Sequence, residues 1–246
     1  MNRRRLAGAG LATLAGVALL VGLGVWQLKR LAWKEGLIAE VAARAHAAPT
    51  SPPPPSAWGA LKPADYEYRR VAVKGVYDYA HQEFIFGALE SPRGRYGGVG
   101  YYVMTPLKLA SGEAIIVNRG FVPETLKAAA DKGPRGEVEV VGLMRASERR
   151  NLFTPADEPA RHEFFSRDVE GLARAMRLGA HAPFVIDAEA GPDPLPEGGE
   201  TRLVFVNNHL GYAFTWFGLA AALAAVFAIY ARGQASGDDQ RDRPRA

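Results

Sequence analysis

The sequence predicts a membrane protein: two transmembrane helices flank an antiparallel β-rich periplasmic domain, barrel- or sandwich-like and of the α+β class. Three observations lead to this fold class. Two uncharged apolar segments, residues 6–28 and 208–230, stand near the ends of the 246-residue chain. Between them the apolar residues change from helical spacing to alternation with a period of two. The chain has no cysteine, which fits an oxidising compartment but is also common elsewhere.

The first apolar segment follows a short basic N-terminus, residues 1–5, and carries no charge from Leu6 to Leu28. As a helix it covers roughly 34 Å, more than the ~30 Å hydrocarbon core of a bilayer. A cleaved signal peptide is the alternative, but the run exceeds the usual ~7–15 apolar residues and no small-x-small site is near. An uncleaved anchor is therefore expected. No Arg- and Ser-rich leader precedes it, which favours a bacterial inner membrane over mitochondrial import.

Residues 29–48 should continue this helix out of the membrane, because Leu37, Ile38, Val41 and Ala45 keep helical spacing. The Pro-rich residues 49–57 then stop the helix and predict an extended polyproline II linker. Recruitment of a partner by this run is the alternative, but the run stands where a spacer is needed.

Residues 58–207 are expected to form the β-rich domain. Runs of β-branched or aromatic residues alternate there between Gly, Pro, Asp and Asn. "SGE" at residues 111–113 predicts a hairpin turn, and residues 190–200 predict an unstructured surface loop because they are rich in Gly and Pro. Short helices are expected in residues 123–132 and 167–178. The expected strands lie in residues 67–79, 82–86, 99–109, 113–122, 137–146, 183–189 and 201–207.

The second apolar segment, residues 208–230, fixes the predicted topology. One arginine, Arg202, lies just before it. The polar tail, residues 231–246, carries four: Arg232, Arg241, Arg243 and Arg245. Positive residues stay on the cytoplasmic side, so both termini should be cytoplasmic and the domain between the spans periplasmic. The formal net charge of +4 forms no basic stripe among aromatics, so no nucleic acid is expected as a partner.

The sequence contains no recognisable catalytic set. A nucleophile elbow, a phosphate loop, a zincin motif and Cys-x-x-Cys are all absent. A membrane-tethered periplasmic enzyme is therefore the least favoured class. Four scattered histidines are interpreted as exposed polar residues: His46, His81, His162 and His181.

The fifth histidine, His209, opens the second apolar segment directly after Asn208, a suitable N-cap residue. In a helix, His209, Tyr212 and Trp216 fall on one face. Neutral imidazole is a good axial ligand for iron and aromatic walls can pack a macrocycle, so this face suits a flat amphipathic ligand such as haem. The alternative is that His209 caps the helix and the rings face lipid headgroups.

A second group of aromatic and basic residues lies where the chain leaves the first predicted transmembrane helix. Trp26, Arg30 and Trp33 share one helical face, which is also the ordinary pattern of an interfacial belt. Arg30 leaves the first span at the same membrane face as His209, so it is the candidate partner for a haem propionate, with Trp26 as a further candidate contact.

Small residues predict where the two spans pack against each other, since they let helices approach closely in lipid. The predicted stripes are Gly8, Ala12 and Gly16 on the first span and Gly211, Thr215, Gly218 and Ala222 on the second.

Three segments carry a family likeness: "GVWQLKRLAWK" at residues 24–34, "TPLKLASGEAIIVNRGFVP" at residues 105–123 and "NNHLGYAFTWFGLA" at residues 207–220. In this order they resemble the surfeit locus protein family, the cytochrome c oxidase assembly factors of mitochondria and bacteria. The likeness covers most of the chain from residue 24 to residue 220. It implies the same two-span topology and a role in maturing the haem–copper oxidase catalytic subunit.

For bacterial members the resemblance further implies binding of haem a, with the histidine of an N-H-x-x-Y-x-x-T-W motif, here His209, as the proposed iron ligand. The implied partners are oxidase subunit I, the haem a synthesis or insertion machinery and the lipid bilayer. A haem-free scaffold that stabilises an assembly intermediate is the alternative. Asp157, Phe164 and Phe165 depart from the Asn- and Trp-rich stretch expected of the family, which bears on partner contacts.

Overall fold

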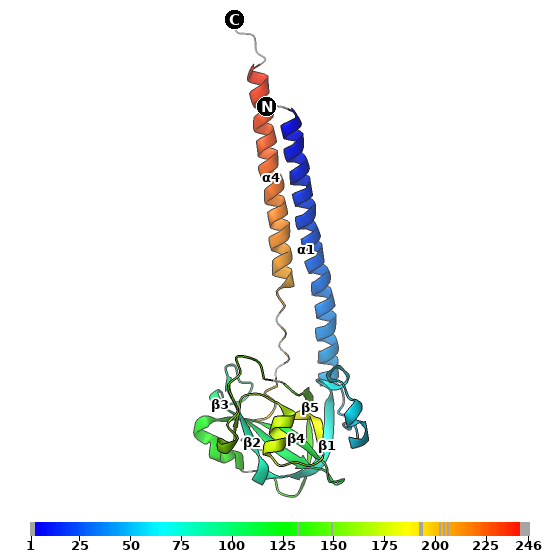
Figure 1. The fold of residues 1–246 in the computed structure, drawn as a ribbon, viewed down its shortest axis with the longest axis vertical. Coiled ribbons are helices and arrows are strands. Elements are labelled where there is room, and N and C mark those ends of the chain that lie inside the picture. The colour runs from blue at the N-terminus through cyan, green and yellow to red at the C-terminus, as the bar shows by residue number, and fades with distance from the viewer. Residues whose placement is uncertain are drawn as a thin grey trace. The chain divides into compact units, whose positions relative to one another are not determined.

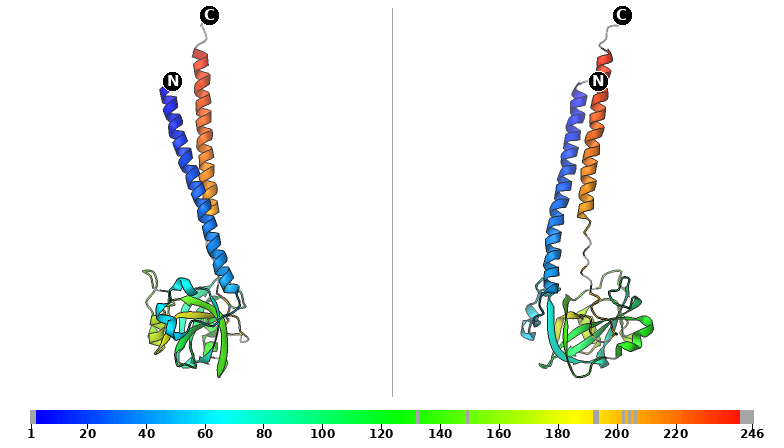
Figure 2. Two further views of the ribbon diagram at one scale, coloured as in Figure 1. Left: turned by 90° about the vertical axis from the view of Figure 1, so that its right-hand side faces the viewer. Right: turned by 180° about the vertical axis from the view of Figure 1, so that it is seen from behind.

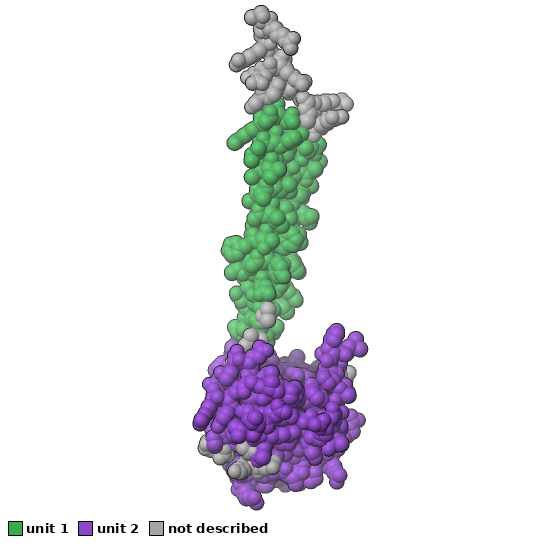
Figure 3. Space-filling model, turned by 90° about the vertical axis from the view of Figure 1, so that its left-hand side faces the viewer, with its two compact units in different colours: residues 1–40, 204–246 green, residues 41–203 purple. Residues whose placement is uncertain are grey.

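A computed structural model describes residues 3–131, 133–148, 150–191, 194–201, 203, 205 and 207–241. The chain forms two compact units. One contains residues 1–40 and 204–246 and is called here the helical unit; the other contains residues 41–203 and is called the β domain (Figure 3, green and purple).

Two long helices make up the helical unit, α1 (Arg3–His46) and α4 (His209–Arg241), and they run side by side (Figures 1 and 2). Leu6–His46 and His209–Gln234 are each long and apolar enough to cross a membrane, by length and composition. Large apolar side chains point away from the partner helix, for example Leu11 at 74% exposure and Phe214 at 70%. The prediction of two long apolar helices is confirmed.

The two helices pack along a seam with alternating spacings of three and four residues, the pattern of left-handed helix pairs. Three glycines of α1 receive large side chains of α4. A Cβ at Gly24 would lie 2.6 Å from the ring of Phe217, and one at Gly16 would lie 2.9 Å from Leu223. The buried and half-buried seam residues with this spacing are Gly10, Thr13, Val17, Leu20, Gly24 and Gln27 on α1 and His209, Ala213, Trp216, Ala220, Leu223 and Phe227 on α4, and the half-buried Gly16 and Phe217 lie beside them.

The predicted small-residue stripes are therefore mostly wrong. A methyl group added at Gly8 of α1, or at Gly211 or Gly218 of α4, would touch no neighbouring atom, so these glycines face away from the seam. Of the predicted residues, Gly16 is at the seam. The helices approach by seating Phe and Leu of α4 over glycines of α1, rather than by bringing two glycine faces together.

The helix α1 continues without a break to His46, whose Nδ1 lies 2.7 Å from the carbonyl oxygen of Ala42. The Pro-rich segment that follows is attached to the β domain. Thr50 bridges to Val71 of the first strand, and the indole of Trp58 donates a 2.9 Å hydrogen bond to the carbonyl of Pro53. A 3₁₀ helix, η1 (Pro55–Ala60), ends the segment. It is therefore a strap on the domain surface rather than a free spacer.

The β domain is a seven-stranded sheet in the order β1-β5-β7-β4-β3-β2-β6. An additional pairing of β1 with β3 closes five of the strands into a small barrel, which confirms the barrel form of the prediction. The strands are β1 (Arg70–Tyr77), β2 (Glu83–Leu89), β3 (Gly98–Lys108), β4 (Ala114–Pro123), β5 (Glu137–Ala146), β6 (Glu163–Phe164) and β7 (His181–Ala188).

The sheet is mixed, which corrects the expectation of a purely antiparallel sheet. The pairs β4–β7 and β2–β6 are parallel, and the others are antiparallel. The parallel pair inside the barrel has a geometric reason. A closed ring with an odd number of strands cannot alternate direction at every step, so at least one neighbouring pair must run parallel.

Six of the seven predicted strands are confirmed. The seventh is wrong: residues 201, 203, 205 and 207 are not in a strand, and Arg202, Val204 and Val206 lie outside the described residues. The predicted turn is confirmed, with Gly112 at φ +99° and the Leu109 N–H donating to the Glu113 carbonyl. Short helical elements are α2 (Pro63–Tyr66), η2 (Tyr79–His81), η3 (Glu124–Asp131), η4 (Pro159–Arg161) and α3 (Val169–Ala175), so both predicted short helices are present.

The core has two main parts that share β4. Ile115 and Val117 point into the barrel among Val71, Met144 and Phe184. Ile116 points to the opposite face, under Leu172 and Met176 of the α3 region. Because β4 is buried on both faces, its sequence is a nearly continuous apolar run.

The loop at residues 190–200 is held by specific contacts, which corrects the expectation of an unstructured loop. The Glu200 carboxylate accepts hydrogen bonds from the backbone N–H groups of Arg93 and Gly94, and Glu197 accepts from those of Arg95 and Tyr96. Glu200 is only 7% exposed. Pro192 and Asp193 lie outside the described residues.

Candidate functional site

The histidine that opens α4 is oriented by a side chain of α1. Nδ1 of His209 lies 2.7 Å from Oε1 of Gln27. An amide oxygen only accepts, so Nδ1 carries the proton and donates, and Nε2 keeps its lone pair. In the described part of the chain Nε2 has no hydrogen-bond partner. A histidine that donates from one ring nitrogen and leaves the other free is the usual arrangement of a metal-binding imidazole.

Gln27 occupies a seam position one turn after Gly24, and it is 9% exposed. A buried amide in an apolar helix is costly unless it is hydrogen-bonded, so its pairing with His209 stabilises both side chains. The sequence-based reasoning missed Gln27. The available signal was an uncharged polar residue inside the apolar run "GVWQL", where a residue without a role would be unfavourable.

The structure brings only some of the other predicted haem-contact residues close to His209. Trp216 is half-buried and lies two turns after His209 on the seam face of α4. Tyr212 and Trp26 project from their helices, at 55% and 56% exposure. Arg30 lies one turn after Gln27, with its guanidinium carbon 4.0 Å from the centroid of the Trp33 ring. The cation–π partner of Arg30 is thus Trp33 rather than Trp26.

This geometry fits a single axial ligand to haem iron. Within the described ranges no group of three or more His, Cys, Asp or Glu side chains is placed to hold a bare metal ion. A macrocycle supplies most of the ligands of its own iron, so one oriented imidazole is sufficient. Half-exposed aromatic rings and a guanidinium one turn from Gln27 add apolar and cationic contacts of the kinds a haem requires.

The family comparison covers this site. The chain matches the SURF1 family over residues 14–221, a range that includes Gln27, Arg30 and His209. The chain belongs to the SURF1 family. It is 38% identical over 229 residues to Surfeit locus protein 1 of Homo sapiens, a match covering 86% of this chain and 74% of the human protein.

Other relatives of this SURF1-family chain agree. Surfeit locus protein 1 of Mus musculus is 37% identical over 82% of this chain and 68% of the mouse protein. A SURF1-like protein of Monosiga brevicollis is 35% identical over 86% of this chain and 83% of that protein. The resemblance stated from the three motifs is confirmed. Membership in the family implies a role in cytochrome c oxidase assembly.

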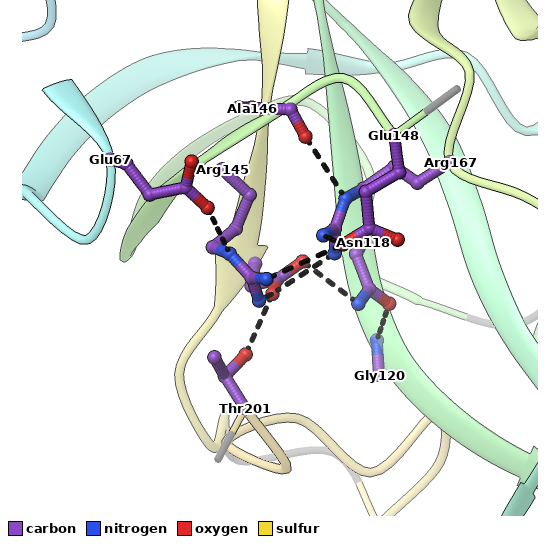
Figure 4. Close-up of polar contacts among 9 residues, drawn as sticks. Glu67, Asn118, Gly120, Arg145, Ala146, Glu148, Arg167 and Thr201 are labelled. Atoms are coloured by element: carbon purple, nitrogen blue, oxygen red, sulfur yellow. Dashed lines mark hydrogen bonds and ion pairs between the residues drawn. The ribbon is translucent and has the colours of Figure 1, made fainter. Parts of the chain in front are cut away.

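A second polar group of the chain lies in the β domain and centres on Asp187 of β7, which is 4% exposed. Its carboxylate pairs with Arg145 at 2.9 Å and accepts hydrogen bonds from Thr201 at 2.8 Å and Asn118 at 3.0 Å. Figure 4 shows Glu67, Glu148 and Arg167 completing this group, called here the Asp187 cluster.

The Asp187 cluster is structural. Burial acts to lower the pKa of Arg145, but Asp187, Tyr68 and Glu67 outweigh it, so its pKa is raised and the guanidinium stays charged. The carboxylates and guanidiniums satisfy one another, which a buried charged group requires. Because Asn118, Arg145 and Asp187 belong to three adjacent strands, the cluster joins β4, β5 and β7.

The remaining histidines have hydrogen-bonding partners, either close in sequence or, for His162, on the distant strand β2. His81 lies 2.9 Å from Asp78, His162 lies 3.1 Å from the buried Glu83, and Nδ1 of His181 lies 2.9 Å from the carbonyl oxygen of Gly179. Together with His46 they belong to turns and to the ends of secondary-structure elements, where such polar contacts are ordinary.

The residues that depart from the family pattern serve the fold. Oδ1 of Asp157 accepts a 3.0 Å hydrogen bond from the N–H of Phe165. Phe164 is 3% exposed in the core under α3, and the Phe165 ring packs 6.0 Å from that of Phe86. These contacts account for all three side chains without a partner protein.

Proposed function

We propose that this chain is an assembly factor for cytochrome c oxidase, anchored in a bacterial inner membrane, that binds haem a and delivers or holds it for the catalytic subunit. The observation that carries the proposal is the hydrogen bond from His209 to Gln27, which leaves Nε2 of the imidazole with its lone pair. Membership in the SURF1 family is the reason for proposing cytochrome c oxidase as the complex that is assembled. In this proposal the haem is cargo for subunit I and arrives from the haem a synthesis or insertion machinery.

The membrane part of the proposal rests on the outward faces of α1 and α4. Leu14, Phe214 and Ile229 are 69–70% exposed on these helices. Exposing such apolar side chains to water is unfavourable in free energy, and contact with lipid acyl chains removes that penalty. Two spans place both chain ends on one side. The excess of Arg after the second span supports cytoplasmic ends and a periplasmic β domain. Of the residues counted for this topology, Arg202, Arg243 and Arg245 lie outside the described residues.

Each site residue has a separate part in the proposal. His209 binds the iron through Nε2, while Gln27 fixes the tautomer and the ring plane. Arg30 holds a propionate by a charge-assisted hydrogen bond. The rings of Trp216, Tyr212 and Trp26 cover apolar parts of the macrocycle. The task is binding and release, so the iron–imidazole bond would form on binding and break on release, and no covalent bond of the macrocycle needs to change.

Spectroscopy of the purified protein tests this proposal. The full chain is purified from cells that also make haem a, and its visible spectrum is recorded beside those of His209→Ala and Arg30→Ala. His209→Ala should lose most of the haem or shift its spectrum, because an axial ligand is removed. Arg30→Ala should lower haem occupancy but keep the spectrum, because only the periphery is changed. Wild-type occupancy and spectrum in His209→Ala would exclude this ligand.

A haem-free scaffold for an oxidase assembly intermediate is the second candidate. The same hydrogen bond favours it in one respect, because a buried pair of polar side chains between two helices also fastens the helices to each other. A colourless protein that still supports oxidase assembly would identify this function.

A further inference from the structure

The turn between β5 and β6 presents two large apolar side chains to solvent. Leu152 is 97% exposed and Phe153 is 93% exposed. Elsewhere in the described β domain the most exposed large apolar side chain is Val99, at 52%. Single exposed apolar residues are ordinary on protein surfaces. Two adjacent ones, almost completely exposed at the tip of one turn, indicate a surface that is covered when the protein works.

The turn is held in shape by hydrogen bonds among its own residues. The N–H of Asn151 donates to Oγ1 of Thr154 at 3.2 Å, and the N–H of Phe153 donates to Oδ1 of Asn151 at 2.8 Å. The N–H of Thr154 donates to the Asn151 carbonyl, and Nη2 of Arg150 donates to the Thr154 carbonyl at 3.3 Å. These bonds satisfy three N–H groups within the turn itself, those of Asn151, Phe153 and Thr154, which lowers the cost of taking this part of the backbone out of water.

We propose that Leu152 and Phe153 insert into the boundary between headgroups and acyl chains of the membrane. This inference rests on the membrane anchoring in the proposed function. Each backbone donor that is satisfied inside the turn lowers the cost of entering an apolar medium. The pair therefore forms a small apolar wedge on a turn in which three backbone donors are already bonded.

The size of the wedge favours lipid over a protein partner. A buried aromatic side chain removes about 150–250 Å² from water, so the two residues offer a few hundred Å² at most. A stable protein interface needs about 800 Å² on each partner. Lipid needs no complementary surface, and a small convex tip is sufficient for partial insertion.

Charge and chain length point to the same occupant. The exposed Arg150 is attached to the base of the turn, where a guanidinium pairs well with lipid phosphates. Arg149, its neighbour in sequence, lies outside the described residues. Residues 204–208 alone link the β domain to α4, and a link of this length reaches roughly 20 Å when fully extended. Residue 203 therefore stays within roughly 20 Å of the first residue of α4, the helix that enters the bilayer in the proposed function.

A fluorescent probe at the tip tests the inference. The chain has no cysteine, so Phe153→Cys accepts a single polarity-sensitive label in the full-length protein. The matched control is Ala110→Cys, an exposed position in the turn between β3 and β4. Both proteins are reconstituted in vesicles of phosphatidylethanolamine and phosphatidylglycerol, with and without bromine on the acyl chains.

Insertion should shift the emission of the label at residue 153 to shorter wavelength and quench it with brominated lipid, while the label at residue 110 should show neither effect. Equal quenching at the two positions would overturn the inference. So would a label at residue 153 that escapes lipid quenching and is shielded only when oxidase subunit I is added. Alkaline extraction of the same vesicles checks the anchoring separately: release of both proteins would overturn the membrane proposal itself, whereas haem occupancy of the wild-type chain does not depend on the tip.

Discussion

Nδ1 of His209 and Oε1 of Gln27 lie 2.7 Å apart, which joins the first turn of α4 to the seam of α1 across 182 residues of sequence. The bond sets the tautomer of the imidazole and holds the ring plane. In the proposed function it would also make haem binding dependent on the packing of the helix pair, because Gln27 is placed by the same seam as Gly24 and Ala213.

Gln27→Met should weaken haem retention by about 10- to 100-fold while His209 is intact, because metal-binding histidines depend on the group that holds the other ring nitrogen. Gln27→Glu keeps an acceptor oxygen at a similar reach and should retain the haem better. Haem content per protein after gel filtration measures the effect. Equal retention by the Met variant and the wild type would show that the bond only fastens the helices.

Gly24→Leu should separate the helix pair, because its Cβ would lie 2.6 Å from the Phe217 ring before the rest of the side chain is placed. Gly218→Leu is the matched control, since no neighbouring atom lies within contact of a methyl group there. Thermal aggregation in detergent should begin at a lower temperature for the Gly24 variant alone. The prediction fails if the Gly218 variant is the less stable of the two.

The sequence was sufficient to predict the two apolar helices but not the seam between them. Small residues occur all round both helices, so composition does not select a face. The deciding residues are Phe217, Leu223 and Phe227, which are large and apolar like the exposed residues beside them. Only the facing glycines of α1 distinguish the two groups.

Gly120→Ala should strongly destabilise the β domain. Gly120 has φ +133°, and a methyl group there would overlap the backbone of Glu197 and Gly198. We expect a loss of about 3 kcal/mol or more, since the neighbours are backbone atoms that cannot turn aside. Gly112→Ala has a positive φ but open space around it, so about 1–2 kcal/mol is expected. Chemical unfolding followed by the fluorescence of the buried Trp58 measures both, and equal losses would contradict the role assigned to the Glu197 backbone.

The pair of Glu189 and Arg70 should make the β domain less stable in acid. Hydrogen bonds from Arg70, at 2.6 and 2.8 Å, lower the pKa of the Glu189 carboxyl below its ordinary value. The unfolded chain then binds the proton more readily. The stabilisation is therefore full above the ordinary Glu pKa and is lost as the pH falls through the lowered folded value.

Glu189→Gln should accordingly lower stability modestly at neutral pH, as expected of a partly exposed ion pair, and have a smaller effect at about pH 3, which is below the ordinary Glu pKa. Unfolding curves at both pH values measure the difference. A variant whose loss is the same at both would show that the carboxylate charge contributes nothing.

The candidate site was predictable in part, because His209 stands out as an imidazole at the start of an apolar helix. Gln27 was not found, since its partner is far away in sequence and no local pattern joins them. The loop at residues 190–200 was missed for a similar reason. Its Gly and Pro content predicts irregular backbone correctly, but Glu197 and Glu200 fasten it to residues 93–96, and composition cannot show a contact between two loops.

The position of β7 determines when the β domain can fold. This last strand, His181–Ala188, lies between β4 and β5 and brings Asp187 to Asn118 and Arg145. Until it arrives, β4 and β5 have unpaired edges and the barrel is open. Because residues 181–188 are made shortly before α4, the domain cannot close while most of it is being synthesised. The nascent chain must therefore remain free of aggregation with two exposed strand edges until translation has almost reached the second apolar helix.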